Sequence, residues 1–258
     1  MSSSSSAPAA PAGGPIALVP VLRDSLRYWR RYCSYLTPIA ALLWLPLGVL
    51  EVTGVAHGVE IDVEKFHPGD IVVNVMIAIV FELLVAELLA AAAEKIVSSE
   101  LHHTELQSGR KFLTTVPWLS LVLATLVYET GVAIGMLFFV IPGYVIATWG
   151  VVTGPVVVAE RSRAVRAPGR SRDLVRGSFR PVAIFVFIVF VVGEAIALAA
   201  GTLLELLPRG WPEPVGEYLV RVATSPLFGM ATAVLYYALV AREQARKRDE
   251  PAEAGPSM

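Results

Sequence analysis

The segment FFVIPGYVI, residues 138–146, decides the fold because it interrupts an apolar run that is too long for one membrane helix. A helix from Phe112 to Ala159 would be about 70 Å long, more than twice the roughly 30 Å of hydrocarbon in a bilayer. Pro142 cannot continue the backbone hydrogen-bond ladder, and Gly143 adopts turn geometry at low cost. We therefore predict a structural turn at Pro142 and Gly143 and two spans from this run, residues 112–139 and 143–159.

Four further apolar blocks are long enough to cross a bilayer, which takes about 20 residues. They are residues 33–56, 71–93, 182–204 and 218–241. Only 17% of the chain is charged, whereas soluble domains carry roughly 25%. The sequence therefore predicts an all-α polytopic membrane protein, a bundle of six transmembrane helices in one domain of residues 16–243.

The two ends of the chain differ from this apolar domain. Residues 1–15 are rich in Ser, Ala, Pro and Gly, and residues 244–258 are charged and then rich in Pro and Ala, so both are predicted to be disordered tails. The segment IALVPVLRDSLRYWRRY, residues 16–32, mixes leucines and aromatic residues with arginines at helical spacing. It is interpreted as an amphipathic segment in the membrane plane or as a basic extension of the first span.

Basic residues give the orientation. Six spans place both termini on one side of the membrane, together with most of the 21 Lys and Arg residues. Cytoplasmic flanks of membrane helices are enriched in Lys and Arg. We therefore predict a bacterial cytoplasmic (inner) membrane protein with the N-terminus and the C-terminus in the cytoplasm.

The most basic connection is ERSRAVRAPGRSRDLVRGSFRP, residues 160–181. It is predicted to form a short interfacial helix with Leu174, Val175 and Phe179 toward lipid and arginines toward water, where each basic residue contributes about 1 kcal/mol of attraction to anionic lipid. The candidate contacts with anionic head groups are Arg166, Arg170, Arg172 and Arg176. A formal net charge of -1 and the lack of a recognition motif argue against a nucleic-acid partner.

Three segments carry a resemblance to a known family. FFVIPGYVIATWGVVTGPVVVAE (138–160), RSRDLVRGSFRPVAIF (170–185) and SPLFGMATAVLYYALVARE (225–243) resemble the membrane domain that precedes the catalytic domain in some bacterial glycerophosphoryl diester phosphodiesterases, and its stand-alone relatives. The matching pattern consists of Pro142, Gly143, Glu160, Ser171, Leu174, Gly177, Tyr236, Tyr237, Arg242 and Glu243. The resemblance implies a bundle of about six helices. The phosphodiesterase activity of that family belongs to a soluble β/α barrel, and no segment here has the length or pattern for one, so no enzyme is predicted.

Four carboxylates lie inside the apolar spans, where a charge costs at least about 2.5 to 3.5 kcal/mol and normally faces the bundle interior or a wet cavity. They are Glu82, Glu87, Glu129 and Glu194. If they converge, they could share protons or hold a cation in a transporter or channel-like protein. Each could instead form a hydrogen bond with a neighbouring helix and act only in packing.

No metal site or cofactor is predicted. Cys33 is the single cysteine, and the neighbouring His102 and His103 would point about 100° apart on a helix, which suits two ligands of one metal poorly. We therefore predict a non-enzymatic multi-pass membrane scaffold, or a module that interacts with lipid or with an unknown protein partner. The alternative is a transporter or channel-like protein that uses the intramembrane glutamates.

Overall fold

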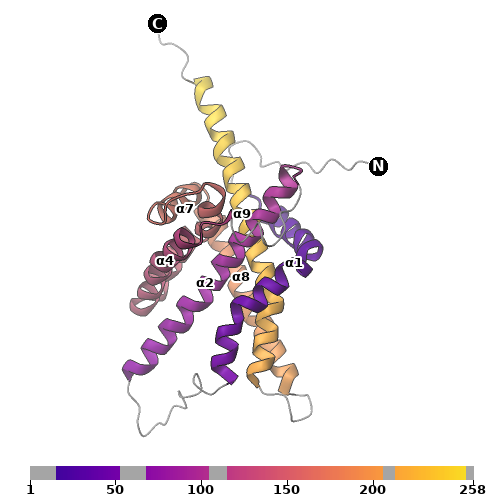
Figure 1. Cartoon of the computed structure of the whole chain (residues 1–258). Coiled ribbons are helices and arrows are strands. Elements are labelled where there is room, and N and C mark those ends of the chain that lie inside the picture. The colour runs from indigo at the N-terminus through magenta and orange to yellow at the C-terminus, as the bar shows by residue number, and fades with distance from the viewer. Residues whose placement is uncertain (1–15, 53–67, 105–114, 206–212, 254–258) are drawn as a thin grey trace.

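The computed structural model describes residues 16–52, 68–104, 115–205 and 213–253, and within these ranges all regular structure is helical (Figure 1). The helices are α1 (Leu18–Val52), α2 (Pro68–Leu101), α4 (Trp118–Phe138), α5 (Val140–Gly150), α6 (Thr153–Ala159), α7 (Ala167–Arg176), α8 (Phe179–Glu205) and α9 (Glu213–Glu253). The prediction of an all-α fold is confirmed.

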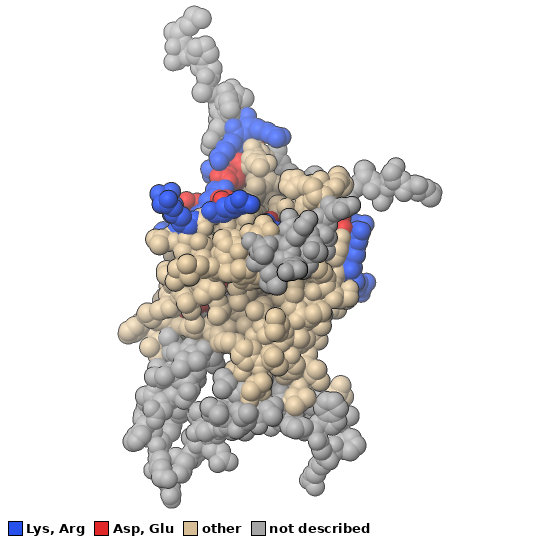
Figure 2. Space-filling view, viewed as in Figure 1, with Lys and Arg blue, Asp and Glu red and all other residues tan. Residues whose placement is uncertain are grey.

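Four helical stretches of the described residues are long and apolar enough to cross a membrane. They are Leu18–Val49, Trp118–Phe138, Val140–Ala159 and Tyr218–Asp249. Their outer surface is apolar as well: Phe138, Phe139 and Ile141 are 71%, 72% and 77% exposed. Figure 2 shows Lys and Arg gathered around the upper part of the molecule, with a broad uncharged surface below them. Contiguous apolar surface of this kind is unfavourable in water, which indicates a membrane protein.

Helix α9 runs through the middle of the bundle and packs along α1, α2 and α8 (Figure 1). Gly229 lets α9 approach α2 closely, because a Cβ at this position would lie 2.8 Å from the backbone of Leu89. A polar contact fixes α1 to α9, since Trp44 Nε1 donates a hydrogen bond to Ser225 Oγ at 3.0 Å. The pair α4 and α5 packs beside α2, which it contacts through α4, and α6 contacts α2 directly.

The turn between α4 and α5 lies three residues before its predicted position. Phe139 is the extended residue, with φ -157° and ψ 134°, and α5 begins at Val140. Pro142 lies in the first turn of α5, where a missing N–H is tolerated because the first N–H groups of a helix have no intrahelical partner. Gly143 is required for packing, since a Cβ at this position would lie 2.5 Å from the backbone nitrogen of Met136.

The predicted fourth span, residues 143–159, is two helices. Helix α5 ends at Gly150 and α6 begins at Thr153, with Val151 and Val152 between them. Together α5 and α6 still make a stretch long enough to cross a membrane. The break lies next to the buried carboxylates described below.

Helix α7 forms where a short basic helix was predicted, but its apolar face is turned differently. Leu174 and Val175 are buried against the protein, and Ser171 Oγ donates a hydrogen bond to the carbonyl oxygen of Trp149 at 2.7 Å. The prediction that Leu174 and Val175 face lipid is wrong, because α5 and α6 cover this side of α7. Phe179 packs edge-on against the Trp149 ring, with centroids 6.2 Å apart.

The ends of the domain are more helical than predicted. Residues 16–32 do not form a separate helix, because α1 is continuous from Leu18 to Val52. Residues 244–253, predicted as part of a disordered tail, continue α9. This extension contains strong helix formers and an i,i+4 ion pair between Glu243 and Lys247 at 3.1 Å. Residues 1–15 and 254–258 lie outside the described residues.

Candidate functional site

The structure brings together two of the four predicted intramembrane glutamates. Glu87 on α2 is 6% exposed and Glu129 on α4 is 0% exposed. Glu82, five residues before Glu87, is exposed. Glu194 lies on α8, and its side chain is outside the described part of the chain. The candidate site is therefore centred on Glu87 and Glu129.

Glu87 binds the backbone at the start of α6. The N–H of Gly154 donates a hydrogen bond to Glu87 Oε2 at 2.5 Å. The first N–H groups of a helix lack intrahelical partners, so the carboxylate satisfies a donor that the break before α6 creates. Only glycine fits at position 154, because a Cβ would overlap the same carboxylate oxygen. The break and the glutamate therefore form one structural unit.

Glu129 reaches this unit from α4. The preceding residue, Tyr128, donates a hydrogen bond to the carbonyl oxygen of Ala147 at 2.7 Å and packs on Gly150, at the end of α5. Glu129 follows Tyr128 directly on α4, and its carboxyl group is near enough to that of Glu87 for the two to repel each other. Glu87 lies on α2 and Glu129 on α4, and α2, α4 and α6 pack against one another.

Four buried oxygen atoms of this site lack hydrogen-bond partners among the described residues. They are Glu129 Oε1, Glu129 Oε2, Thr125 Oγ1 and Thr153 Oγ1. Thr125 is one turn before Glu129, and Thr153 directly precedes Gly154. Buried polar atoms in folded proteins nearly always have a protein, water or ion partner, so this group of oxygens calls for a functional explanation.

A second polar cluster joins α7, the end of α6 and α9. Arg170 Nη1 and Nη2 donate to the two carboxylate oxygens of Glu243 at 3.0 and 2.6 Å, and Arg170 Nε donates to Glu160 Oε1 at 3.0 Å. Tyr236 donates a further hydrogen bond to Glu160 Oε1 at 3.4 Å. The hydrogen bonds to Glu243, more than those to Glu160, hold the pKa of Arg170 above its ordinary value. Arg170 thus joins α7 to the end of α6 and to α9.

The four arginines predicted to contact lipid therefore have different surroundings. Arg170 is engaged by two carboxylates. Arg172 lies over the Trp149 ring, with its guanidinium carbon 4.6 Å from the ring centroid. Arg166 and Arg176 are exposed. The prediction for Arg170 needs correction, because its hydrogen-bonding fork is directed into the protein.

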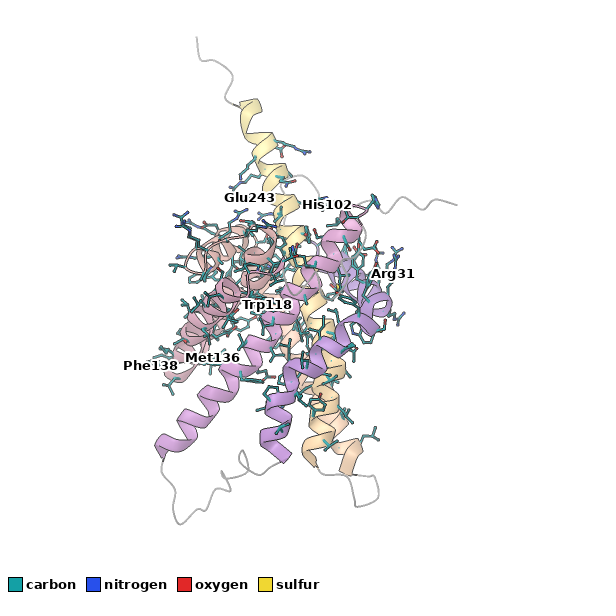
Figure 3. The ribbon with its side chains drawn as sticks, viewed as in Figure 1. Arg31, His102, Trp118, Met136, Phe138 and Glu243 are labelled. Atoms are coloured by element: carbon teal, nitrogen blue, oxygen red, sulfur yellow. The ribbon has the colours of Figure 1, made fainter. Side chains whose placement is uncertain are left out.

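A basic hollow lies on the N-terminal part of α1. It is lined by Arg23, Leu26, Arg27, Arg30 and Arg31, all of which are exposed. Arg31 also forms an ion pair with Glu100 at 2.9 Å, which attaches this part of α1 to the end of α2. In Figure 3, Arg31, His102 and Glu243 lie above Met136 and Phe138, which mark the lower end of α4. The arginines of α1 and of α7 thus lie toward the same end of the bundle.

Of the two neighbouring histidines, His103 lines a pocket together with Arg31, Tyr32, Ser99, Glu100 and Thr104. His102 and His103 are exposed at the end of α2. Within the described ranges, no group of three or more His, Cys, Asp or Glu side chains could hold a metal ion.

Two features of these clusters were missed in the sequence. The pairing of Arg170 with Glu243 joins residues 73 positions apart, and nothing in a charged run identifies a partner at that distance. The arginines of α1 were predicted to belong to an amphipathic segment or a basic extension of the first span, but the hollow between them was not predicted. Comparison with known proteins adds nothing to these observations, because no family model, no curated protein and no solved structure matches the chain.

Proposed function

We propose that the chain is a non-enzymatic, six-span module of a bacterial cytoplasmic membrane that binds anionic lipid head groups at its inner face. The single observation that carries this proposal is the basic hollow on α1, where four arginines surround Leu26. Guanidinium groups suit phosphate, and an exposed leucine among them suits the boundary between head groups and acyl chains.

Six spans agree with the direction of the helices. In Figure 1, α1, α4 and α8 run down the page and α2 and α9 run up it. Gly135 lies against Gly143 and Tyr128 against Gly150, so α5 runs antiparallel to α4. This alternation supports the proposal of six crossings. Both ends of the domain then lie with α7 on one side, and the excess of arginine there supports the cytoplasm as that side.

Anionic lipid is a suitable ligand for this surface because the positive charge is concentrated here and not spread over the whole chain. The whole chain has a formal net charge of -1, so it has no general affinity for polyanions. Each arginine close to a negatively charged leaflet contributes about 1 kcal/mol, and Arg166 and Arg176 of α7 add to the arginines of α1. A protein partner with an acidic surface would use the same charges.

The proposal is tested by lipid retention. In purified protein, R27Q/R30Q should lower retention of phosphatidylglycerol or cardiolipin about 30-fold, since two contacts of about 1 kcal/mol each are lost. The control is R246Q/R248Q, which removes the same charge from exposed positions on the extension of α9. Equal retention by the two variants and the unmodified protein would contradict lipid binding at α1.

Proton-coupled or cation-coupled transport is a second candidate function. The observation that favours it is the binding of buried Glu87 at the break between α5 and α6, with Glu129 near enough to repel it, because interrupted membrane helices often border ion sites in transporters. Uptake of Na⁺ or protons into liposomes that contain the protein tests it. No flux above that of empty liposomes would exclude it.

A further inference from the structure

The buried carboxylates Glu87 and Glu129 lack the neutralising partners that such groups need. Among the described residues neither forms an ion pair, and the single hydrogen bond between them and the protein is the one from Gly154 to Glu87. Two uncompensated charges in a low-dielectric interior would cost several kcal/mol each. The pair must therefore take up positive charge, either as protons or as another cation.

Protons alone would neutralise the carboxylates but leave other atoms unexplained. The hydroxyl oxygens of Thr125 and Thr153 are fully buried and have no hydrogen-bond partner in the described part of the chain. Thr125 lies on α4, which also carries Glu129, and Thr153 lies on α6, next to the Gly154 N–H that binds Glu87. Two carboxylates and two hydroxyls from three helices form a set of hard oxygen donors, which suits small hard cations.

The charge of the site favours a monovalent cation. One cation and one retained proton would neutralise both carboxylates. A divalent ion such as Ca²⁺ takes six to eight oxygen ligands and is generally held by several carboxylates. Tyr128 is the further titratable group beside the pair, and its hydroxyl is already bound to the carbonyl oxygen of Ala147.

We propose that Glu87, Glu129, Thr125 and Thr153 form a buried binding site for a small monovalent cation of the Na⁺ class, which exchanges with protons. The site goes beyond lipid binding at α1. It would underlie the second candidate function, but binding and transport are measured separately.

Na⁺ binding to the purified full-length protein tests the proposal. At pH 8, ²²Na⁺ should bind once per chain, and NaCl should raise the melting temperature relative to choline chloride at equal ionic strength. E129Q should abolish both effects, and T125V should weaken binding at least tenfold. E82Q is the matched control, because it removes a carboxylate from an exposed position on α2 and should leave binding unchanged.

A second measurement needs no variant and covers the case in which E129Q does not fold. A hydrophobic carbodiimide reacts with protonated carboxyl groups in apolar surroundings, so it should label Glu129, and Na⁺ should protect this residue while choline does not. Labelling that Na⁺ leaves unchanged, or a Na⁺ effect that persists in E129Q, would overturn the proposal. Na⁺ binding without flux would leave the proposal standing and remove only the transport function.

Discussion

Arg170→Ala should destabilise the protein strongly, because this one side chain holds three helices together. It donates two hydrogen bonds to Glu243, at 3.0 and 2.6 Å, and one to Glu160, at 3.0 Å. A hydrogen bond to a charged group contributes about 1.5 to 3 kcal/mol. The side chain is 29% exposed, so solvent screens part of this interaction. We expect a net loss of about 3 kcal/mol.

The loss is measured as a shift of the melting temperature in detergent. For domains of 150 to 250 residues, 1 kcal/mol corresponds to about 2–4 °C, so Arg170→Ala should melt about 6–12 °C lower. Arg170→Lys keeps the charge but not the planar fork and should lose roughly half as much. Arg176→Ala, at an exposed position of the same helix, is the control and should shift melting by less than about 2 °C.

A double-mutant cycle separates the pair from its surroundings. If Arg170 and Glu243 act through each other, R170A/E243A should be less damaging than the sum of the single variants by at least about 1 kcal/mol. Additive effects, or a shift for Arg170→Ala no larger than that for Arg176→Ala, would refute the assignment of Arg170 as a link between α7 and α9.

Two further predictions concern packing and topology. Gly135→Ala should destabilise the protein by about 1–3 kcal/mol in a melting experiment, because the new Cβ would lie 2.8 Å from the backbone of Gly143. Gly131→Ala is the control and should be tolerated, because its Cβ would meet only the side chain of Ile146, at 3.8 Å. Equal melting of the two variants would contradict the close contact between α4 and α5. A phosphatase fused after Met258 should be inactive in a bacterial host and a fluorescent protein there should be bright, because the proposed topology has this end in the cytoplasm. An active phosphatase would contradict the proposed topology.

The sequence predicted the helices well because the length of an apolar run can be read directly from the order of the residues. The predicted spans 71–93, 182–204 and 218–241 lie within α2, α8 and α9. The turn was placed three residues late, since Pro142 is a helix breaker inside a helix but acceptable in its first turn. The composition of residues 244–253 looked like a tail, although the same charged residues favour helix when they continue one.

The sites were predicted less completely because they depend on which helix faces which. Hydropathy identified Glu87 and Glu129 as unusual, but only the packing of α2, α4 and α6 separates them from the exposed Glu82. For α7, amphipathic spacing gave the apolar face correctly but not what covers it: Leu174 and Val175 meet protein where lipid was expected. The spacing of side chains predicts which face of a helix is apolar, whereas the element that covers this face depends on how the helices pack.

Helix α6 gives the two polar clusters a physical connection. Its first turn is fixed to Glu87 through the N–H of Gly154, and Glu160, directly after its last residue, is fixed to Arg170. The helix has seven residues, so the two anchors are about 10 Å apart along a rigid element. A cation that moved Glu87 would therefore displace the segment that holds α7 and its arginines in place. Arg170→Ala should remove this link, and Na⁺ binding should then persist while any effect of Na⁺ on lipid retention disappears.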